Sequence, residues 1–530
     1  MPSKYVISDA TLATVPRRSA SHDVVVLKFG GTTVGATPDQ GRIKIARLAI
    51  AELIEQGNWV VAVFSAYRRG RSGSGDRLSV TDLLQNYGKV VGEAPSFAEG
   101  MSRFKSALLD VHLSLMRDLK LADEDELVED VKRNVEHISD TVQVCCTAYE
   151  RIPSLDDYIV TAGERLAVKI LAGYFNRMHA AGKFPIRAVP VTALELGIYT
   201  DDRFGSAAID WPLAVEHARE IVVGQYLEHD LLPVVTGFDG IYDPGKEFKE
   251  IMQSSVKEAD DRQYSNVYRT SLGRGGSDLT ATFLGLALEA RYVGFCKETP
   301  GVLTADDMLV GDAAQTIPLL SYDLATEAGN IYGRAVEPVR ASGVPVHIFD
   351  PARPERRTVV SDARLEDGLY IVERPIKTVN IHVGTIPDEP GELSRFLGVF
   401  ARFDMNVEEI RHQRSGTDAI VISDDEDAIQ ALVKELDELG LRPIALYTWY
   451  LRVIGNLTEE LTAKFNDFMS AYRPLTLASY QMDAKVVTAT VPRNRAGTQL
   501  DETNRVERIV RELHDQLVAS AFRDRKATAG

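Results

Sequence analysis

The sequence predicts an α/β fold, and three observations point to it. A short apolar, β-branched run at Val24–Leu27 is followed by apolar residues at helical spacing from Ile43 to Ile54, and then by a second apolar run at Val60–Phe64. Strand, helix and strand in this order favour a parallel sheet with a right-handed crossover. Further strand patterns recur along the chain, and its C-terminal part contains a weak internal repeat.

The composition excludes several classes of protein. The 530 residues include 60 Lys+Arg and 77 Asp+Glu, a net charge of −17, and 45% of them are hydrophobic. This hydrophobic content excludes a largely disordered chain, and the acidic balance argues against non-specific nucleic-acid binding. The chain has no long apolar run that would span a membrane, and its 3 cysteines are too few for a disulfide scaffold. We therefore expect a cytoplasmic protein with no nucleic-acid or membrane partner.

The first domain is predicted at residues 23–365, after a flexible tail of residues 1–22 that lacks the apolar core of a secretory signal. Residues 95–150 show long helical patterns without strand signals, so we expect a helical excursion packed on the sheet domain. The remaining strand patterns of this domain are Ala188–Val191, Leu232–Val235, Tyr292–Phe295 and Val344–Ile348.

The C-terminal part contains two similar segments, predicted at residues 369–448 and 449–522. Each begins with a strand pattern that is followed by a helix pattern, further strands and a second helix, which is typical of a βαββαβ unit. The patterns are strands at Val379–Gly384 and Leu451–Asn456, first helices at Gly391–Phe403 and Glu459–Tyr472, and second helices at Asp425–Leu439 and Asn504–Val518.

Two glycine-rich segments indicate anion binding. The first, Lys28–Thr33, reads Lys-Phe-Gly-Gly-Thr-Thr and lies where a strand pattern gives way to a helix pattern. Glycines let backbone amides approach an anion, a helix N-terminus favours negative charge, and the lysine can place an ammonium on a phosphoryl group. A plain tight turn explains the segment equally well, and it matches neither the P-loop nor the dinucleotide-binding fingerprint.

The second glycine-rich segment, Ser271–Thr280, holds three glycines around Arg274 and precedes an apolar helix pattern. Ser277 and Asp278 are also ordinary helix N-caps, which is the alternative explanation. Two anion cradles in one sheet domain predict a ligand with several anionic groups. A nucleoside triphosphate with an acidic co-substrate would fit.

The same segments resemble signatures of the aspartate kinases, a branch of the amino-acid-kinase family. Lys28–Val34 is similar to the family's Lys-Phe-Gly-Gly-Thr-Ser-Val, and Gly273–Asp278 is identical to its Gly-Arg-Gly-Gly-Ser-Asp. Further elements that resemble the family pattern follow in the right order, so that the resemblance spans residues 24–520. These elements are Ser65-Ala66, Thr81–Leu83, Thr161–Glu164 and Thr200–Gly205.

This resemblance implies a three-layer αβα amino-acid-kinase domain with a helical insertion, followed by two ACT-like domains. It also implies ATP-dependent phosphorylation of the L-aspartate side-chain carboxylate to 4-phospho-L-aspartate, with Mg²⁺, on the route to lysine, threonine or methionine. In that family the substrate carboxylate attacks the γ-phosphate without a general base, because it is already ionised at neutral pH. A regulatory amino acid such as lysine or threonine, and a homodimer or dimer of dimers formed through the ACT domains, are further expectations.

The resemblance also assigns roles to individual residues. Lys28 and Asp202 are the catalytic candidates: Lys28 would hold the transferring phosphoryl group, and Asp202 would orient it unless it only caps a turn. Glu164 would hold the substrate ammonium unless it is a solvated helix residue, and Arg274 could equally form a structural ion pair. Substrate binding falls to Ser65, Ala66, Thr81, Glu164, Arg274 and Ser277, nucleotide binding to Lys28, Gly30, Gly31, Thr32, Gly275, Gly276, Lys297 and Glu298, and effector binding to Pro390, Gly391, Asp404 and Asn406. No metal-ligating residue is assigned.

The chain departs from the family pattern at residues 297–308, where the usual tyrosine, proline and arginine are replaced. Two alternative functions stay open: the altered loop favours the first, and the second follows from the resemblance of the C-terminal segments to ACT domains, which bind amino acids. One is a kinase for a different amino-acid carboxylate, and the other is a catalytically weak sensor that binds amino acids. Lys28, Asp202 and the intact loop at residues 273–278 argue against the sensor.

Overall fold

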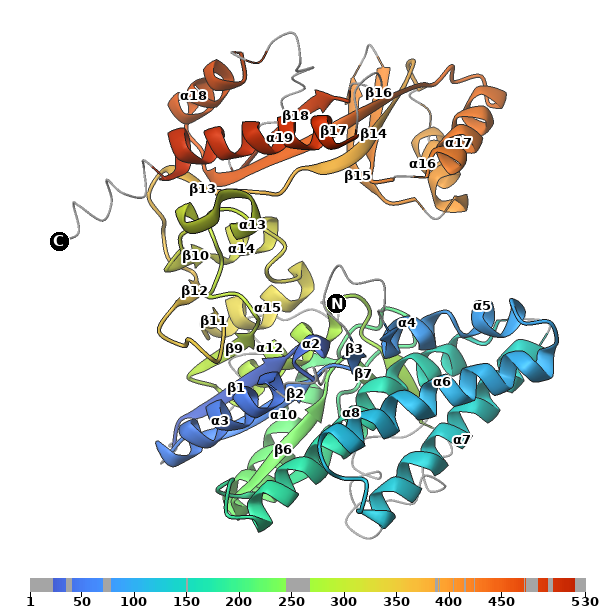
Figure 1. Ribbon diagram of the computed structural model, residues 1–530, viewed down its shortest axis with the longest axis vertical. Helices are drawn as coiled ribbons and strands as arrows, with labels where there is room; N and C mark the ends of the chain where they lie inside the picture. Colours follow the sequence, from blue (N-terminus) through green and yellow to red (C-terminus); the bar gives the residue numbers. More distant parts are fainter. Residues whose placement is uncertain are drawn as a thin grey trace. The chain divides into compact units, whose positions relative to one another are not determined.

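The computed structural model divides the chain into two compact units. The N-terminal unit comprises Met1–Val302 and Pro318–Ala363, and the C-terminal unit comprises Leu303–Ile317 and Arg364–Gly530 (Figure 1). The tail predicted at residues 1–22 lies outside the described residues, apart from His22. The structure describes residues 22–34, 41–69, 78–148, 151–244, 267–386, 389, 391–403, 405–413, 416–423, 425–470, 472, 485–493 and 499–519.

An eight-stranded sheet is the centre of the N-terminal unit in the described part of the chain. In sheet order the strands are β10 (Leu319–Ser321), β12 (Arg357–Ser361), β11 (Val346–Phe349), β9 (Tyr292–Cys296), β1 (Val24–Phe29), β2 (Trp59–Phe64), β6 (Leu231–Thr236) and β5 (Arg187–Val191). All neighbouring strands pair in parallel except β11 and β12. The predicted α/β class is confirmed, and the apolar runs of the sequence are the central strands.

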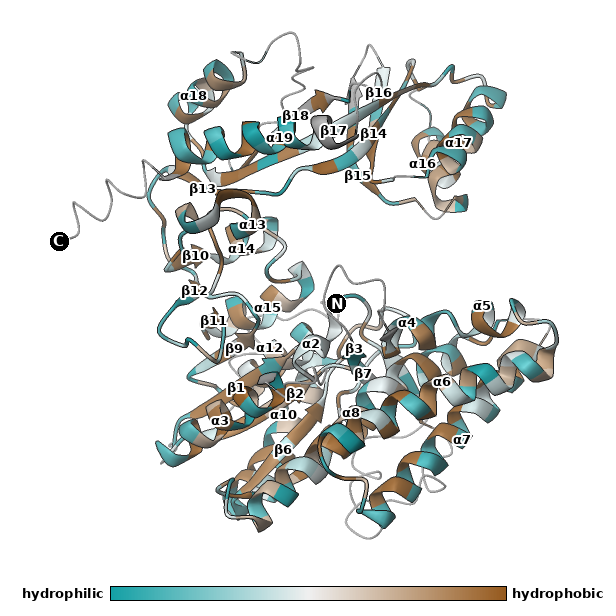
Figure 2. Ribbon diagram, in the orientation of Figure 1, coloured by the Kyte–Doolittle hydropathy of each residue, from teal (hydrophilic) through white to brown (hydrophobic). Residues whose placement is uncertain are grey.

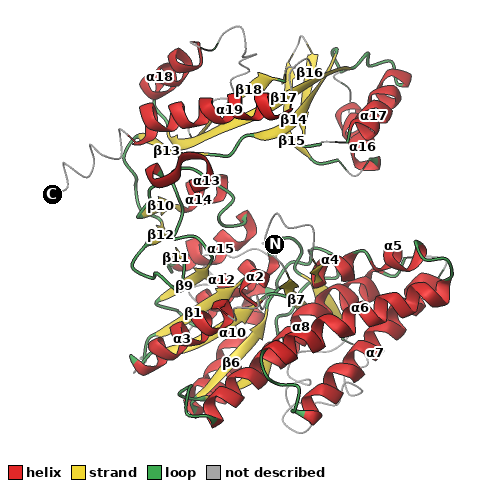
Figure 3. Ribbon diagram, viewed as in Figure 1, coloured by secondary structure: helices red, strands yellow, loops and turns green. Residues whose placement is uncertain are grey.

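Helices cover both faces of this sheet, which makes it the middle of three layers (Figure 3). The helices of this unit are α2 (Gly31–Val34), α3 (Gly41–Glu55), α4 (Val80–Gln85), α5 (Tyr87–Gly92), α6 (Phe97–Asp118), α7 (Asp125–Thr147), α8 (Pro153–Ala180), α9 (Ala193–Leu196), α10 (Trp211–Ile221), α12 (Gly276–Ala287), α14 (Tyr322–Glu327) and α15 (Gly333–Ser342), with the short turns Val222–Tyr226 and Leu227–His229 after α10. Val25 and Leu27 lie in one core cluster with side chains of α3 and α8. The alternate residue Val26 is also fully buried, and α12 packs against β1 on that other face. Burial on both faces explains why the central strands are apolar along most of their length (Figure 2).

The segment expected to be a helical excursion contains α6 and α7. Both helices carry an apolar stripe, and fully buried residues of that stripe such as Phe104 and Val131 join the core cluster of α3 and α8. Within the described ranges, no helix combines the length and the apolar character that crossing a membrane requires.

The C-terminal unit contains a mainly antiparallel sheet that carries helices. Its strands run in the order β13 (Gly368–Val372), β17 (Ile444–Asn456), β14 (Ile376–Val383), β16 (Gly416–Val421) and β15 (Val407–Gln413), and β18 (Val486–Pro492) also pairs with β17. The helices are α13 (Asp307–Val310), α16 (Glu392–Arg402), α17 (Glu426–Glu438), α18 (Glu459–Ser470) and α19 (Gln499–Leu513), with the short turns Gly311–Ala313 and His514–Ala519.

Two hydrophobic cores in this unit share the long strand β17. Ala445 and Tyr447, in its first half, pack against the core that includes Phe396 and Leu432. Trp449 and later residues of the strand belong to a second core with α18, β18 and α19. The strand predicted at Leu451–Asn456 is only the second half of β17, and the predicted boundary between residues 448 and 449 falls inside this strand.

The segment Leu303–Ile317 belongs to the C-terminal unit although N-terminal-unit sequence precedes and follows it. Leu309 is 5% exposed in the second core, and its carbonyl accepts a hydrogen bond of 2.7 Å from Arg511 Nε. Thr304 Oγ1 lies 2.9 Å from His514 Nε2 in a buried contact. The domain predicted at residues 23–365 includes this segment, whereas in the structure the segment is part of the C-terminal unit.

Candidate functional site

A cavity of 690 Å³ opens where β1, β2 and β6 end. Lys28 lies near the end of β1, Ser65 follows β2 and Phe238 follows β6. Ligands of open parallel sheets bind outside the carboxyl ends of the strands, so this is the expected place for a site. The described residues that line the cavity are Lys28, Ser65, Thr81, Gln85, Arg151, Asp156, Asp157, Val160, Glu164, Gly205, Phe238, Ser271, Gly273, Arg274, Gly275, Gly276, Ser277, Asp278 and Tyr332.

Lys28 pairs with Asp278 at the glycine-rich end of the cavity. The distance from Lys28 Nζ to Asp278 Oδ1 is 2.7 Å, and only 18% and 12% of the two side chains are exposed. Asp278 lies in the first turn of α12, where the helix dipole stabilises a carboxylate. The sequence analysis considered Asp278 only as a helix cap and missed its pairing with Lys28. A signal was available in the sequence, because Asp278 belongs to the segment Gly273–Asp278, which is identical to the family signature.

The second glycine-rich segment requires glycine at Gly275. Its φ is +77°, and a Cβ atom at this position would lie 2.4 Å from the ring of Tyr332. Arg274 Nε donates a 2.8 Å hydrogen bond to the Tyr332 hydroxyl, and its guanidinium lies 5.6 Å from the centre of the same ring. Arg274 is therefore anchored to an aromatic ring at the rim of the cavity rather than to a carboxylate.

The first glycine-rich segment lies close to the predicted substrate loop. A Cβ atom at Gly31 would lie 2.5 Å from the carbonyl oxygen of Ala66. Ala66 itself is buried and does not line the cavity, whereas Ser65 and Thr81 do. The structure therefore brings Ser65, Thr81, Glu164, Arg274 and Ser277 together around one cavity, with Ala66 directly behind it.

Glu164 is a buried carboxyl group on the cavity wall. It lies on α8 with 3% of its surface exposed, and its Oε2 has no hydrogen-bond partner among the residues that the structure describes. Burial raises the pKa of Glu164 to about 8, and a hydrogen bond from the main chain of Ala66 acts in the opposite direction. The alternative of a solvated helix residue is wrong, because this side chain is shielded from solvent.

Asp157 is a second buried carboxyl group that the sequence analysis missed. It precedes Glu164 by two turns of α8, so the spacing on one helix face was the available signal. Its carboxylate accepts hydrogen bonds of 2.9 Å from the Gly205 amide and 2.7 Å from the Ser271 amide. Asp157 therefore connects two loops that border the cavity. Burial raises the pKa of Asp157 to about 6, and the hydrogen bonds from these two amides act in the opposite direction.

Arg334 connects the same two loops from another side. Its guanidinium donates to the carbonyl oxygens of Ala207 at 2.6 Å and Leu272 at 2.9 Å, and to Ser206 Oγ at 3.0 Å. Burial lowers the pKa of Arg334. Because its guanidinium donates hydrogen bonds to both loops, Arg334 holds the two loops together.

Asp202 is not among the residues that line the cavity. It is exposed in a turn, whereas the preceding Asp201 is buried and accepts hydrogen bonds from Arg203 Nε at 2.6 Å and the Ala208 amide at 2.9 Å. The carboxylate that contacts Lys28 is Asp278. The orienting role of Asp202 is not supported by this geometry, and it stays a prediction.

The predicted nucleotide residues after β9 lie near the first glycine-rich segment. Thr32 Oγ1 donates a hydrogen bond to the Glu298 carboxylate. Lys297 Nζ donates to the carbonyl oxygen of Asn330 at 3.1 Å, and burial lowers the pKa of Lys297 while the charge of Asp278 raises it. None of these three residues lines the cavity among the residues described, so their contact with a nucleotide stays a prediction.

The predicted effector residues belong to the C-terminal unit. Pro390 and Asp404 lie outside the described residues. Gly391 is the N-cap of α16 with a φ of +96°, and Asn406 is exposed just before β15. Their role in binding an effector stays a prediction.

The cavity can hold a molecule that carries charges of both signs. Lys28 and the main chain at the start of α12 suit an anionic group at one end. The partnerless oxygen of Glu164 suits a cationic donor at the wall of α8.

Comparisons with known proteins agree with this arrangement. A model of the amino acid kinase family matches residues 23–350, which is more than half of the chain. Aspartokinase 3, chloroplastic, of Arabidopsis thaliana is 26% identical over 329 residues, which cover 57% of this chain and 52% of that protein. The aspartokinase of Geobacillus stearothermophilus is 26% identical over 344 residues, which cover 64% of this chain and 59% of that protein. The chain spans about half the length of the curated relatives that it matches.

Solved structures share the fold. The structure of Escherichia coli aspartokinase III in complex with aspartate and ADP superimposes with a TM-score of 0.65 at 21% identity, covering 93% of this chain and 99% of that one. The lysine and aspartate complex of the same enzyme gives a TM-score of 0.66 at 22% identity with the same coverage. The family resemblance inferred from the two glycine-rich signatures is confirmed: this chain belongs to the amino acid kinase family.

Proposed function

We propose that this chain transfers the γ-phosphoryl group of ATP to the side-chain carboxylate of L-aspartate and forms 4-phospho-L-aspartate. The observation that carries the proposal is the 690 Å³ cavity around which the Lys28–Asp278 pair, the loop at residues 273–276 and Glu164 lie together. The named aspartokinase relatives, and the aspartokinase III structure in complex with aspartate and ADP, support the same reaction.

Glu164 would bind the α-ammonium group of the substrate. Its Oε2 is buried and has no hydrogen-bond partner in the described part of the chain, and an ammonium would supply one. Without a ligand the pKa of Glu164 is raised to about 8 by burial. This pKa would fall when the substrate binds, because a nearby positive charge favours the carboxylate. Ser65 and Thr81, on the same cavity, would donate hydrogen bonds to the substrate.

The nucleotide phosphates would bind at the glycine-rich end. Lys28 would contact the transferring phosphoryl group, and the main-chain amides of Gly30–Thr32 and Gly275–Gly276 would approach its oxygens. Lys297 and Glu298 would border the rest of the nucleotide.

The reaction needs positioning more than proton transfer. An oxygen of the substrate carboxylate forms a bond to the γ-phosphorus, the bond from that phosphorus to the β,γ-bridging oxygen breaks, and ADP leaves with the electron pair. The carboxylate is already ionised at neutral pH, so no base is required. Lys28 would stabilise the negative charge on the phosphoryl oxygens as they pass between the two molecules.

Mg²⁺ would accompany the nucleotide and neutralise phosphate charge. In kinases it is held largely by substrate phosphates, waters and one or two carboxylates rather than by a protein cage. Across the described ranges, no three His, Cys, Asp or Glu side chains gather as such a cage. Asp278, at the Lys28 end of the cavity, is the carboxylate that fits this arrangement.

The C-terminal unit would regulate the enzyme through ACT-like domains at residues 369–448 and 449–522. Strand β15 pairs only with β16 among the described strands, and an exposed sheet edge invites pairing with a second copy. We infer a homodimer or a dimer of dimers that binds lysine or threonine near Gly391 and Asn406. The lysine complex of aspartokinase III supports an amino-acid effector.

The experiment that tests the reaction is an ATP-consumption assay of the full chain across amino acids, with hydroxylamine present to trap an acyl phosphate as a hydroxamate. We expect ADP and hydroxamate to form together with L-aspartate. Formation with L-glutamate alone would favour a kinase for another carboxylate. Amino-acid binding without ATP turnover would favour the sensor.

The regulatory part is tested separately by sedimentation velocity and by inhibition assays with lysine, threonine and methionine. We expect a dimer or larger oligomer, and a 5- to 150-fold change in affinity as a typical coupling, equivalent to about 1–3 kcal/mol. A monomer that is indifferent to all three amino acids would contradict the regulation and leave the kinase proposal standing.

A further inference from the structure

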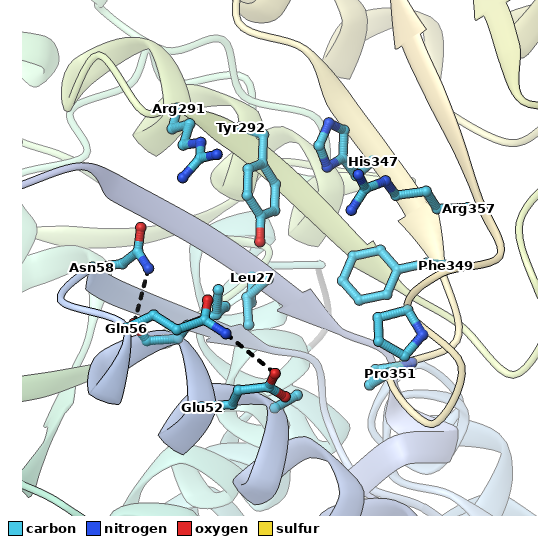
Figure 4. A pocket seen from close by; sticks show the side chains of 13 residues that line it. Leu27, Glu52, Gln56, Asn58, Arg291, Tyr292, His347, Phe349, Pro351 and Arg357 are labelled. Atoms are coloured by element: carbon cyan, nitrogen blue, oxygen red, sulfur yellow. Dashed lines mark hydrogen bonds between the residues drawn. The ribbon is translucent and has the colours of Figure 1, made fainter.

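A second cavity of 250 Å³ lies beside α3 in the N-terminal unit (Figure 4). Leu27 lines it, whereas the neighbouring Lys28 lines the first cavity. The two cavities share no lining residue among those that the structure describes. The proposed kinase reaction makes no use of this second cavity.

The body of this cavity suits a flat apolar group. Tyr292 and His347 line the cavity, with their rings stacked at a centroid distance of 4.3 Å and an angle of 15°. Leu53 of α3, Phe349 and Pro351 supply apolar walls. The cavity is smaller than the typical pocket for a drug-sized ligand, about 300–1,000 Å³, so its occupant must be small.

The polar groups at the rim suit one negative charge. Arg291 and Arg357 both line the cavity, and Arg291 is already paired with Asp23 at 3.4 Å. Arg357 makes no salt bridge with any residue that the structure describes. Burial, together with the charges of both guanidiniums, lowers the pKa of His347 to about 4, so the imidazole adds no charge at neutral pH.

Two further groups limit the charge that a bound molecule can carry. The Tyr292 hydroxyl points into the cavity, and it has no hydrogen-bond partner among the described side chains (Figure 4). Glu52 lies on the α3 wall, where it accepts a 3.2 Å hydrogen bond from Gln56. A carboxylate on that wall disfavours a doubly charged phosphate and leaves a single negative charge as the better match.

We propose that this cavity binds a small organic monocarboxylate with a planar apolar body. The carboxylate would pair with the Arg357 guanidinium and accept a hydrogen bond from the Tyr292 hydroxyl. The apolar body would lie against Phe349 and Leu53. The site is independent of the proposed kinase reaction.

The test measures binding of two matched probes to the full chain by saturation-transfer NMR and calorimetry. The probes are 3-phenylpropionate and its neutral analogue 3-phenylpropanamide, which differ only in the charge of the head group. We expect the carboxylate to bind at least about 10-fold more tightly than the amide, as for a hydrogen bond to a charged group. ATP and L-aspartate should not displace it, because they would occupy the first cavity, which has no described lining residue in common with this one.

Arg357→Gln should lower the affinity for 3-phenylpropionate about 10-fold and leave the affinity for the amide unchanged. Arg356→Gln is the matched control, because the adjacent arginine does not line the cavity. Circular dichroism and thermal melts establish that both variants are folded. Equal binding of the two probes, no binding of either, or equal effects of the two substitutions would overturn the proposal.

Discussion

Lys28 Nζ lies 2.7 Å from Asp278 Oδ1, so the lysine of the first glycine-rich segment is held by the carboxylate of the second. Lys28 is at the end of β1 and Asp278 is in the first turn of α12, which packs against that strand. The pair therefore orders an ammonium at the place where the proposed reaction needs one.

Lys28→Ala should lower kcat about 10²- to 10³-fold, because the variant lacks the preorganised cation that would stabilise the negative charge of the transferring phosphoryl group. The matched control is Lys44→Ala, which removes an exposed lysine from α3. Steady-state kinetics of ATP consumption with L-aspartate measure the effect, and urea unfolding shows whether the fold is kept. Wild-type turnover in the Lys28 variant would exclude its assigned role.

Glu164→Gln should raise the KM for L-aspartate and change kcat less. One charge-assisted contact with the substrate ammonium would be lost, and such contacts contribute about 1.5–3 kcal/mol, or roughly 10- to 150-fold. Initial rates at varied L-aspartate, with ATP saturating, measure the change. The KM for ATP is the internal control, since Glu164 is not among the residues assigned to the nucleotide. An unchanged KM for L-aspartate would contradict the ammonium contact.

Glu164 should also make the unliganded protein less stable as the pH rises. Burial raises its pKa from the ordinary 4.5 to about 8, so between these values the folded chain keeps a proton that the unfolded chain has released. The stability gained from the neutral group is complete below the lower value and is lost as the pH rises through the higher one.

Urea unfolding of the wild type and Glu164→Gln at several pH values tests this expectation. The amide does not ionise, so the variant should gain in stability relative to the wild type as the pH rises, by up to about 1.4 kcal/mol for each pH unit inside the window. A difference between the two proteins that does not change with pH would show that Glu164 is already ionised without substrate.

Asp157→Asn should loosen the two loops that Asp157 joins. The amide offers one acceptor oxygen, and its NH₂ group would face the Gly205 and Ser271 amides, which are donors themselves. The free energy of unfolding should fall by about 1–3 kcal/mol, and substrate affinity should fall with it. Asp140→Asn, at an exposed site on α7, is the control. Equal stability of the two variants would contradict the bridging role.

Leu309→Ala should destabilise the C-terminal unit by about 2–5 kcal/mol, because Leu309 is 5% exposed within the second core. The adjacent Met308 is 82% exposed, so Met308→Ala should have little effect. Chemical unfolding monitored by the fluorescence of Trp449, which lies in the same core, measures the difference. Equal unfolding midpoints would show that Leu303–Ile317 does not contribute to the stability of this unit.

Local patterns in the sequence determined the class of the fold and the nature of the site. Apolar runs such as Val60–Phe64 could be read as buried strands, because both faces of the central sheet are covered and no polar alternation interrupts them. The glycine-rich segments could be read as anion cradles, because positions such as Gly275 tolerate no side chain. The edge strand β10, its neighbour β12, and the antiparallel pair β7 (Asp239–Tyr242) and β8 (Tyr268–Ser271) were not predicted from the sequence.

The tertiary structure alone decided which residues meet. The pairing of Lys28 with Asp278, rather than with Asp202, depends on how α12 packs against β1, and no local pattern encodes that contact. Asp157 connects two loops at the cavity because folding brings the Gly205 and Ser271 amides to its carboxylate. Leu303–Ile317 joins the C-terminal core because Leu309 finds its apolar partners far along the chain. Hydrophobic periodicity reports which face of an element is buried, whereas the partner on that face is chosen by long-range packing.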